Sequence, residues 1–178
     1  MRALRSALLV GVVLALAGCG GSSNASKPTP TPTPKPFVAT DAGFSAVFPT
    51  TPQQSTQNTT QTGVSITMTL YLATTNDEQV GVGVAQLPLA PQGAAIQAGL
   101  DGAVDGSAKN TNGTIVSRSN TTFLGQPAED AVIQAQGAVA HERVFFTGSK
   151  IWVLEGITRS LDAKHPHYDT LVATFKTL

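Results

Sequence analysis

The side chains that could do chemistry are few, and two of the three histidines stand together near the C-terminal end. His165 and His167 flank Pro166, and the nearest carboxylates are Asp162 and Asp169. Protein zinc sites normally use three or four nitrogen, sulfur or oxygen ligands at defined spacing. Two histidines without a clear third ligand are a weak pattern. We therefore expect no metal site, but solvent-facing histidines before a helix that Asp162 caps.

The third histidine, His141, stands beside an acid and a base, so a serine hydrolase is the next chemistry to consider. A Ser–His–acid mechanism needs a serine on a sharp turn beside the imidazole. The sequence contains no Gly-x-Ser-x-Gly, and the Gly-Ser-Lys at 148–150 predicts a hairpin turn. We expect no catalytic residue and no cofactor. The alternative is a secreted hydrolase or metal-dependent enzyme that uses His165, His167 and nearby acids.

Two pairs of carboxylates lie close together in the sequence. Glu129 and Asp130 are adjacent, so in a strand they point to opposite faces and cannot act together as a glycosidase pair. Asp101 and Asp105 are four positions apart, a spacing that in a helix suits a solvated face. Neither pair predicts an active site.

Trp152, the single tryptophan, is a candidate binding residue together with His165 and His167. It stands in an apolar run of a predicted strand, which favours packing in the core. The alternative is a stacking or partner anchor on an exposed sheet face, where Tyr71 or Phe145 could join it.

Cys19, the single cysteine, ends a short apolar segment at the N-terminus. Arg2 and Arg5 precede an apolar run of twelve residues, 7–18. At 1.5 Å per residue, a helix of that length spans about 18 Å, well short of the roughly 30 Å hydrocarbon core of a bilayer. The run therefore predicts a secretory signal at 1–18 rather than a membrane span.

The segment Leu16-Ala17-Gly18-Cys19 resembles the lipobox of bacterial lipoproteins at all four positions. The resemblance implies that a diacylglyceryl group joins the Cys19 sulfur, that a lipoprotein signal peptidase cuts before Cys19, and that the new amine can take an acyl chain such as palmitate. Each buried methylene contributes about 0.8 kcal/mol and stable anchoring takes two chains, which a diacylglyceryl group supplies. The alternative is an ordinary signal peptide in which Cys19 is a bystander.

Residues 19–36 predict a lipidated cysteine followed by a tether. Residues 20–26 are small and polar, and the prolines at every second position from 28 to 36 favour an extended polyproline II rod of roughly 28 Å. We favour a spacer over a Pro-rich ligand or a glycosylated threonine stretch. Without Arg2 and Arg5, 9 of the 11 basic residues remain against 11 acidic ones, a net charge of about −2. This charge argues against nucleic-acid binding, since no basic surplus exists to neutralise phosphates.

Residues 37–178 predict one globular domain, because apolar residues recur there in regular patterns. From 64 to 73 large apolar side chains occupy every second position, which is typical of a half-buried strand. Residues 44–48 predict a shorter strand. Residues 80–84 predict a strand in which two glycines admit close packing against the backbone.

The next segment changes to helical spacing. Ile96 and Leu100 begin an apolar face that predicts a helix over 92–109, and three glycines would let this helix lie close against a sheet. A second helix is predicted to begin near Leu161 or after Pro166. Four more strands are predicted, at about 114–123, 127–136, 139–147 and 150–158. This order predicts an α+β fold with a mainly antiparallel sheet of about seven strands and two covering helices.

Three segments resemble the PsbP/Mog1-like α/β/α sandwich, a fold that includes many bacterial lipoproteins. They are Phe44-Ser45-Ala46-Val47-Phe48-Pro49, Leu124-Gly125-Gln126-Pro127-Ala128 and the closing helix Tyr168–Phe175. The resemblance covers most of 37–178 and implies binding or assembly roles that are mostly non-catalytic. No functional residue is carried over, because these motifs are structural.

These features predict a membrane-anchored extracytoplasmic lipoprotein that serves the cell envelope as a non-catalytic binding or assembly module. Its expected partners are the cell membrane, through the lipid anchor, and an envelope protein or small ligand of unknown identity. The alternatives are the enzyme described above and a carrier that holds a small apolar ligand between the sheet and the helix at 92–109.

Overall fold

The computed structural model describes residues 35–61, 64–159, 161 and 163–178. All of them fall in the second of two units of the chain, Pro34–Leu178. The signal peptide, the lipidation of Cys19 and nearly all of the predicted tether lie outside the described residues. The same is true of Asp162 and of the helix cap predicted for it.

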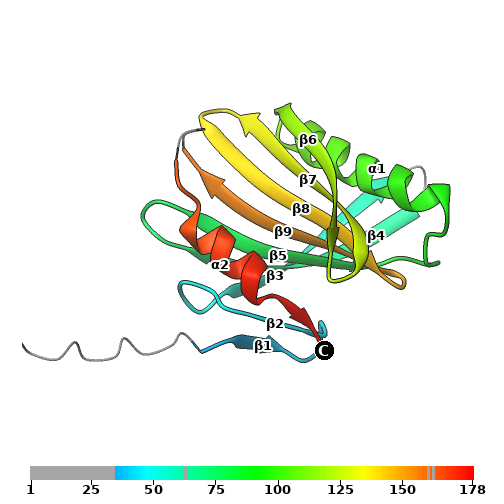
Figure 1. Ribbon diagram of the computed structural model, residues 1–178, viewed down its shortest axis with the longest axis horizontal. Coiled ribbons are helices and arrows are strands. Elements are labelled where there is room, and N and C mark those ends of the chain that lie inside the picture. The colour runs from blue at the N-terminus through cyan, green and yellow to red at the C-terminus, as the bar shows by residue number, and fades with distance from the viewer. Residues whose placement is uncertain (1–34, 62–63, 160, 162) are drawn as a thin grey trace, which may run out of the picture. The chain divides into compact units, whose positions relative to one another are not determined.

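A seven-stranded antiparallel sheet is the main element of the domain (Figure 1). In sequence order its strands are β3 (Gln53–Gln61), β4 (Val64–Thr74), β5 (Gln79–Gln86), β6 (Thr114–Phe123), β7 (Gln126–Ala135), β8 (Ala138–Thr147) and β9 (Lys150–Thr158). In space the strand order is β3-β4-β5-β9-β8-β7-β6. Two runs of hairpins, β3–β5 and β6–β9, are therefore joined by the antiparallel pair of β5 and β9.

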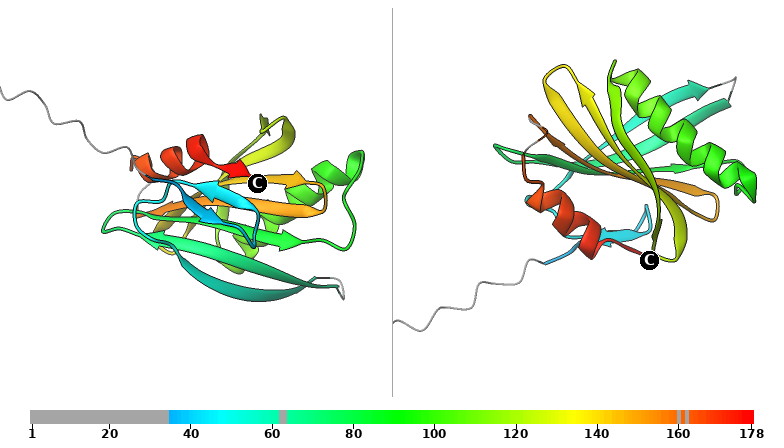
Figure 2. Two further views of the ribbon diagram at one scale, coloured as in Figure 1. Left: turned by 90° about the horizontal axis from the view of Figure 1, so that it is seen from below. Right: turned by 45° about the horizontal axis from the view of Figure 1, so that its top comes forward.

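A second sheet of three short strands uses the two ends of the domain. Its strands are β1 (Phe37–Ala39), β2 (Phe44–Ala46) and β10 (Lys176–Thr177), and β2 pairs with both of the others. Figure 2 shows this sheet beside helix α2 (Pro166–Thr174). The backbone N–H of Val47 donates to the Thr174 hydroxyl at 2.9 Å, which ties α2 to the chain after β2.

The two helices cover opposite faces of the main sheet. Helix α1 (Ala94–Asn110) packs on β6, β7 and β8, and its Leu100 is fully buried. Helix α2 packs on β5 and β9, and its Leu171 is also fully buried. Adjacent residues of β8 show the two sides, since Phe145 belongs to the core under α2 and Phe146 to the core under α1. We call these sides the α2 face and the α1 face.

Aromatic rings build the core of the α2 face. The Phe175 ring contacts Phe44, Phe145 and Trp152 with centroids 5.4 to 5.7 Å apart. Trp152 is 1% exposed, and its indole N–H donates to the Thr147 hydroxyl at 2.7 Å. A buried indole normally finds such a partner for its N–H. Trp152 therefore lies in the core and is not available at the surface as an anchor for a partner.

The segment with alternating apolar residues does form a strand, β4. The large side chains of β4 face a surface that α1 covers only in part. Met68, Leu70 and Leu72 are half-buried on the α1 face, while Tyr71 and Ala73 are buried on the α2 face. Helix α1 packs mainly on the other half of the sheet. The better-covered side of β4 is thus the one with fewer large apolar residues.

The glycines of β5 are the sites where these β4 side chains pack. A Cβ at Gly81 would lie 2.5 Å from Leu72 Cδ2. A Cβ at Gly83 would lie 3.2 Å from Met68 Sδ and from Leu70 Cδ2. The close packing predicted against the backbone of this strand is confirmed.

Two strands differ from the sequence prediction. The strand expected at 44–48 is shorter, Phe44–Ala46, and belongs to the second sheet. The seventh strand of the main sheet is instead the edge strand β3, a run of Gln, Ser, Thr and Asn without apolar alternation. Hydrogen bonding to β4 holds this edge strand in the sheet. The α+β class, the seven-stranded antiparallel sheet and the two covering helices are confirmed.

The helices also refine two expectations. A Cβ at Gly99 would lie 2.9 Å from Phe146 Cζ, whereas one at Gly102 or Gly106 would meet nothing within 4 Å. The expected close approach of α1 to the sheet therefore depends on Gly99 alone. Helix α2 begins at Pro166, the later of the two predicted starts, where the missing N–H of proline costs no helical hydrogen bond.

Candidate functional site

A pocket of about 250 Å³ opens on the α2 face, lined by β6, β7, β8 and Tyr168 of α2. Its polar side chains come from three strands and one helix, and they are Ser117, Ser119, Asp130, His141, Arg143 and Tyr168. We call it the polar pocket. Such a set of hydroxyl, carboxylate, imidazole, guanidinium and phenol groups offers both hydrogen-bond donors and acceptors.

The register of four strands brings these side chains together. Residues paired across neighbouring strands form two rows, Ser117-Val132-His141-Gly156 and Ser119-Asp130-Arg143-Leu154. Because residues two apart in a strand share a face, both rows point toward α2. The pocket is therefore a product of strand pairing.

Gly156 ends the first row and leaves room for Tyr168 of α2. A Cβ at Gly156 would lie 2.5 Å from Tyr168 Cβ and 2.8 Å from its Cγ. The helix therefore rests directly on the backbone of β9 at this point. Burial raises the pKa of the Tyr168 phenol, and the Asp130 carboxylate raises it further. The phenol thus stays protonated and able to donate a hydrogen bond at neutral pH.

Arg143 and Asp130 form a fixed ion pair in the second row. Arg143 Nε lies 2.6 Å from Asp130 Oδ1, and Nη2 lies 2.7 Å from Oδ2. The guanidinium also lies 4.9 Å from the centre of the Phe123 ring. The hydrogen bond to Asp130 raises the pKa of Arg143. Such two-bond pairing fixes the orientation of both side chains, so the polar pocket holds this pair without presenting an unpaired charge.

His141 lines the polar pocket, and its ring lies against the ring of His165 with the two planes tilted by 41°. Their ring centroids are 3.8 Å apart. Nε2 of His141 and both ring nitrogens of His165 are buried, with no hydrogen-bond partner in the part of the chain that the structure describes. Burial lowers the pKa of His141, and the neighbouring His165 lowers it further. His165 is 8% exposed, so the expectation of a solvent-facing side chain was wrong, because the start of α2 packs onto the sheet.

The start of α2 is capped by Glu78, a buried residue of the turn between β4 and β5. Its carboxylate accepts the backbone N–H of His167 at 3.1 Å and of Tyr168 at 2.9 Å. A carboxylate there satisfies unpaired helix N–H groups and interacts favourably with the helix dipole. Glu78 Oε1 also lies 3.9 Å from His165 Nδ1. This cap escaped sequence analysis because Glu78 is 89 positions from His167.

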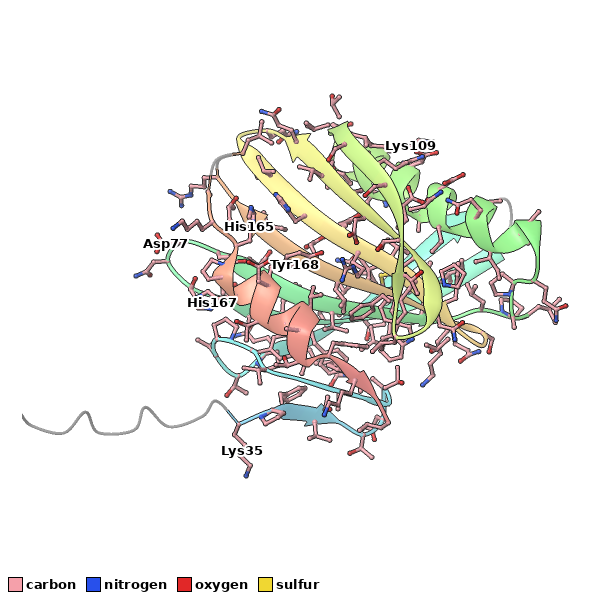
Figure 3. The ribbon with its side chains drawn as sticks, in the orientation of Figure 1. Lys35, Asp77, Lys109, His165, His167 and Tyr168 are labelled. Carbon is pink, nitrogen blue, oxygen red and sulfur yellow. The ribbon has the colours of Figure 1, made fainter. Side chains whose placement is uncertain are left out.

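The two neighbouring histidines take different roles. Figure 3 labels His165 and His167 at the start of α2, and the His165 ring lies against the ring of His141. Within the described ranges, no group of three or more His, Cys, Asp or Glu side chains could hold a metal ion. The contact between His141 and His165 places two imidazole rings beside the polar pocket.

Two further acids meet on the α1 face. Glu142 and Glu155 pair across β8 and β9, and Glu142 is 3% exposed. Burial raises the pKa of Glu142 to about 8, and the charge of Glu155 acts in the same direction, while a hydrogen bond with Ser107 opposes it. Burial also raises the pKa of Glu155. Glu142 is therefore mainly protonated at neutral pH.

Glu129 and Asp130 point to opposite faces, as their adjacency in a strand requires. Glu129 is fully buried, and Arg118 Nε lies 2.7 Å from its Oε1. Burial raises the pKa of Glu129 to about 7, although Arg118 opposes this shift. Arg118 also pairs with Asp105 of α1. Asp105 is exposed as expected, but it also links the helix to β6.

Comparison with solved structures gives the domain a PsbP-like fold. The chain is similar to the cyanobacterial PsbP protein CyanoP from Synechocystis sp. PCC 6803, with a TM-score of 0.56, 13% identity, and coverage of 92% of this chain and 99% of that one. A Pseudomonas aeruginosa protein of unknown function gives a TM-score of 0.40 at 12% identity, covering 64% of this chain and 88% of that one. A Bacteroides thetaiotaomicron protein gives 0.43 at 13% identity, covering 82% and 48%. No protein-family model and no curated protein matches the sequence.

Proposed function

We propose that this chain is a lipid-anchored extracytoplasmic lipoprotein whose PsbP-like domain serves the cell envelope as a non-catalytic binding module. One observation carries the proposal. The single cysteine, Cys19, directly follows Leu-Ala-Gly at the end of an apolar segment too short to span a bilayer. A Gly/Ser and Thr/Pro-rich tether then leads into the folded domain.

The domain itself supports the binding part of the proposal through the polar pocket. Ser117 and His141 lie in one row of the pocket but are separated by the strand that carries Val132. Neighbouring strands are about 4.8 Å apart, so a serine and an imidazole two strands apart are beyond hydrogen-bond reach. The arrangement suits recognition of a polar group better than activation of a nucleophile.

No helix among the described residues is both long and apolar enough to cross a bilayer.

The anchor is tested by Cys19→Ser in the native host, followed by membrane fractionation and intact-mass measurement. We expect the native product to carry lipid at Cys19 and to sediment with membranes, and the variant to lose both properties. A matched control combines Cys19→Ser with Ser22→Cys, which keeps one thiol but moves it away from the Leu-Ala-Gly segment. Lipid on the control, or membrane association that is unchanged in Cys19→Ser, would contradict the proposal.

The pocket is tested by Ser119→Arg, which places a long side chain in the second row. Thr122→Arg is the control, since Thr122 is an exposed residue of the same strand on the α1 face. Both chains are recovered from native membranes after cross-linking. A cross-linked species lost in Ser119→Arg and kept in Thr122→Arg supports binding at the pocket, and equal recovery in both counts against it.

A further inference from the structure

At one end of the main sheet two neighbouring loops are rich in apolar residues and carry no charge, whereas the β4–β5 and β7–β8 turns at the opposite end are polar. At the apolar end the β5–α1 connection, the β6–β7 turn and the β8–β9 turn lie together (Figure 1). The register places them there, because Lys150 pairs with both Gln86 and Thr147. We call residues 87–93 and 124–127 the apolar tip.

The apolar tip exposes large apolar side chains. Leu89 is 82% exposed and Leu124 is 45% exposed. Between the loops lies a pocket of about 220 Å³ whose lining includes Pro91, Ile96 and Phe146. The sequence has no charged residue in 87–100 or in 119–128. An exposed apolar surface of this kind marks a contact with a protein or a membrane.

Leu124 at the apolar tip also has a positive φ. The β6–β7 turn has φ of 51° at Leu124 and 76° at Gly125, and the β7–β8 turn has φ of 41° at Gln136 and 79° at Gly137. Two-residue hairpin turns with both φ values positive favour Asn, Asp or Gly at the first position. At the opposite end of the sheet this position holds a polar residue, Gln136. At the tip it holds leucine, an apolar side chain in an unfavourable conformation pointing to solvent.

We propose that the apolar tip inserts into the interface of the bilayer to which Cys19 is anchored. The inference rests on the proposed lipid anchor and deepens it, because it names a second contact of the same protein with the same membrane. The 17 residues from 20 to 36 reach at most about 53 Å in a polyproline II conformation. A domain of about 140 residues has a radius of gyration of about 14 Å and is therefore roughly 37 Å across. The tether is long enough for any side of the domain to reach the bilayer.

The chemistry of the tip indicates which lipid surface it fits. The tip is uncharged, and the chain after Cys19 has more acidic than basic residues. Attraction to anionic headgroups therefore contributes little, and burial of leucine and proline side chains is the driving force. We therefore expect the apolar tip to bind zwitterionic lipid with an affinity that varies little with salt concentration. The anchor supplies the high local concentration that makes so small an apolar contact effective.

The experiment uses the full lipidated chain in phosphatidylcholine vesicles. Because lipidation consumes the thiol of Cys19, each of four variants carries one free thiol for an environment-sensitive fluorophore. Leu89→Cys and Leu124→Cys report on the tip. Asn76→Cys and Gln136→Cys are matched controls, since both are exposed turn residues at the opposite end of the sheet.

Nitroxide groups on the lipid acyl chains quench only fluorophores that enter the bilayer. We expect quenching at 89 and 124 to exceed quenching at 76 and 136 by about threefold or more, at both low and high salt. Equal quenching at all four positions overturns the inference. Protection of 89 and 124 from aqueous iodide in native membranes, without quenching in pure lipid vesicles, also overturns it and assigns the tip to a protein partner. Intact mass is measured first, so that a missing lipid at Cys19 is recognised as failure of the proposed anchor.

Discussion

The imidazole rings of His141 and His165 lie against each other with their centroids 3.8 Å apart and their planes tilted by 41°. His141 comes from β8, and His165 directly precedes α2. Carboxylates lie near the pair as well, since Glu78 and Asp169 both favour the charged form of His141. Burial and the neighbouring imidazole outweigh them, so the pKa of His141 is lowered. The start of α2 therefore rests against the ring of His141, whose uncharged form burial favours.

The histidine pair predicts a stability loss in mild acid. The folded pKa of His141 is below its unfolded value of about 6.5, so the unfolded chain takes up a proton first as pH falls. Urea unfolding at pH 7.5 and 5.5 should show that the native chain loses about 1 kcal/mol more than His141→Phe between these values. His167→Gln, the control, should keep the native slope. An unchanged pH slope in His141→Phe would show that His141 does not contribute.

Glu142 should give stability the opposite dependence on pH. Its pKa is raised from 4.5 to about 8, so its contribution to stability is fully present below 4.5 and is lost as pH rises toward 8. Between pH 5 and pH 8 the native chain should lose on the order of 2 kcal/mol more than Glu142→Gln, measured by urea unfolding. Asp77→Asn, at an exposed turn position, should behave like the native chain. Parallel pH curves for Glu142→Gln and the native chain would contradict this expectation.

Two glycine substitutions should change the free energy of unfolding in opposite directions. Gly156→Ala places a Cβ 2.5 Å from Tyr168 Cβ, so α2 must move away from β9. We expect a loss of about 1–3 kcal/mol in the free energy of unfolding. Gly102→Ala meets nothing within 4 Å in α1 and should stabilise the domain by up to about 1 kcal/mol. Chemical unfolding of both variants checks the pair, and a neutral Gly156→Ala would mean that α2 shifts without cost.

Removing the long-range cap should loosen the start of α2. Glu78→Ala leaves the backbone N–H groups of His167 and Tyr168 without their acceptor. We expect a loss of about 1–2 kcal/mol and faster hydrogen exchange in the first turn of α2. The neighbouring exposed residue provides the control, and Asp77→Ala should leave exchange in α2 unchanged. Faster exchange spread evenly over the whole domain would indicate general destabilisation.

The sequence by itself determined the local elements of this protein. The alternation in β4, the Gly-containing turns between β6 and β9, and the proline at the start of α2 were enough to give the α+β class and most element positions. These signals are local, because side-chain periodicity and turn chemistry depend on residues a few positions apart. The lipobox at Cys19 is a local signal too, and lipidation there remains a prediction.

Tertiary structure alone decided which side chains meet. The polar strand β3 has no apolar pattern and is a strand because β4 pairs with it. His141 meets His165, and Glu142 meets Glu155, only after strand register and helix packing are set. Burial then shifts the pKa values of His141, Glu142 and Glu155, and burial depends on which elements cover a face. Both are long-range properties, so no short stretch of sequence records them.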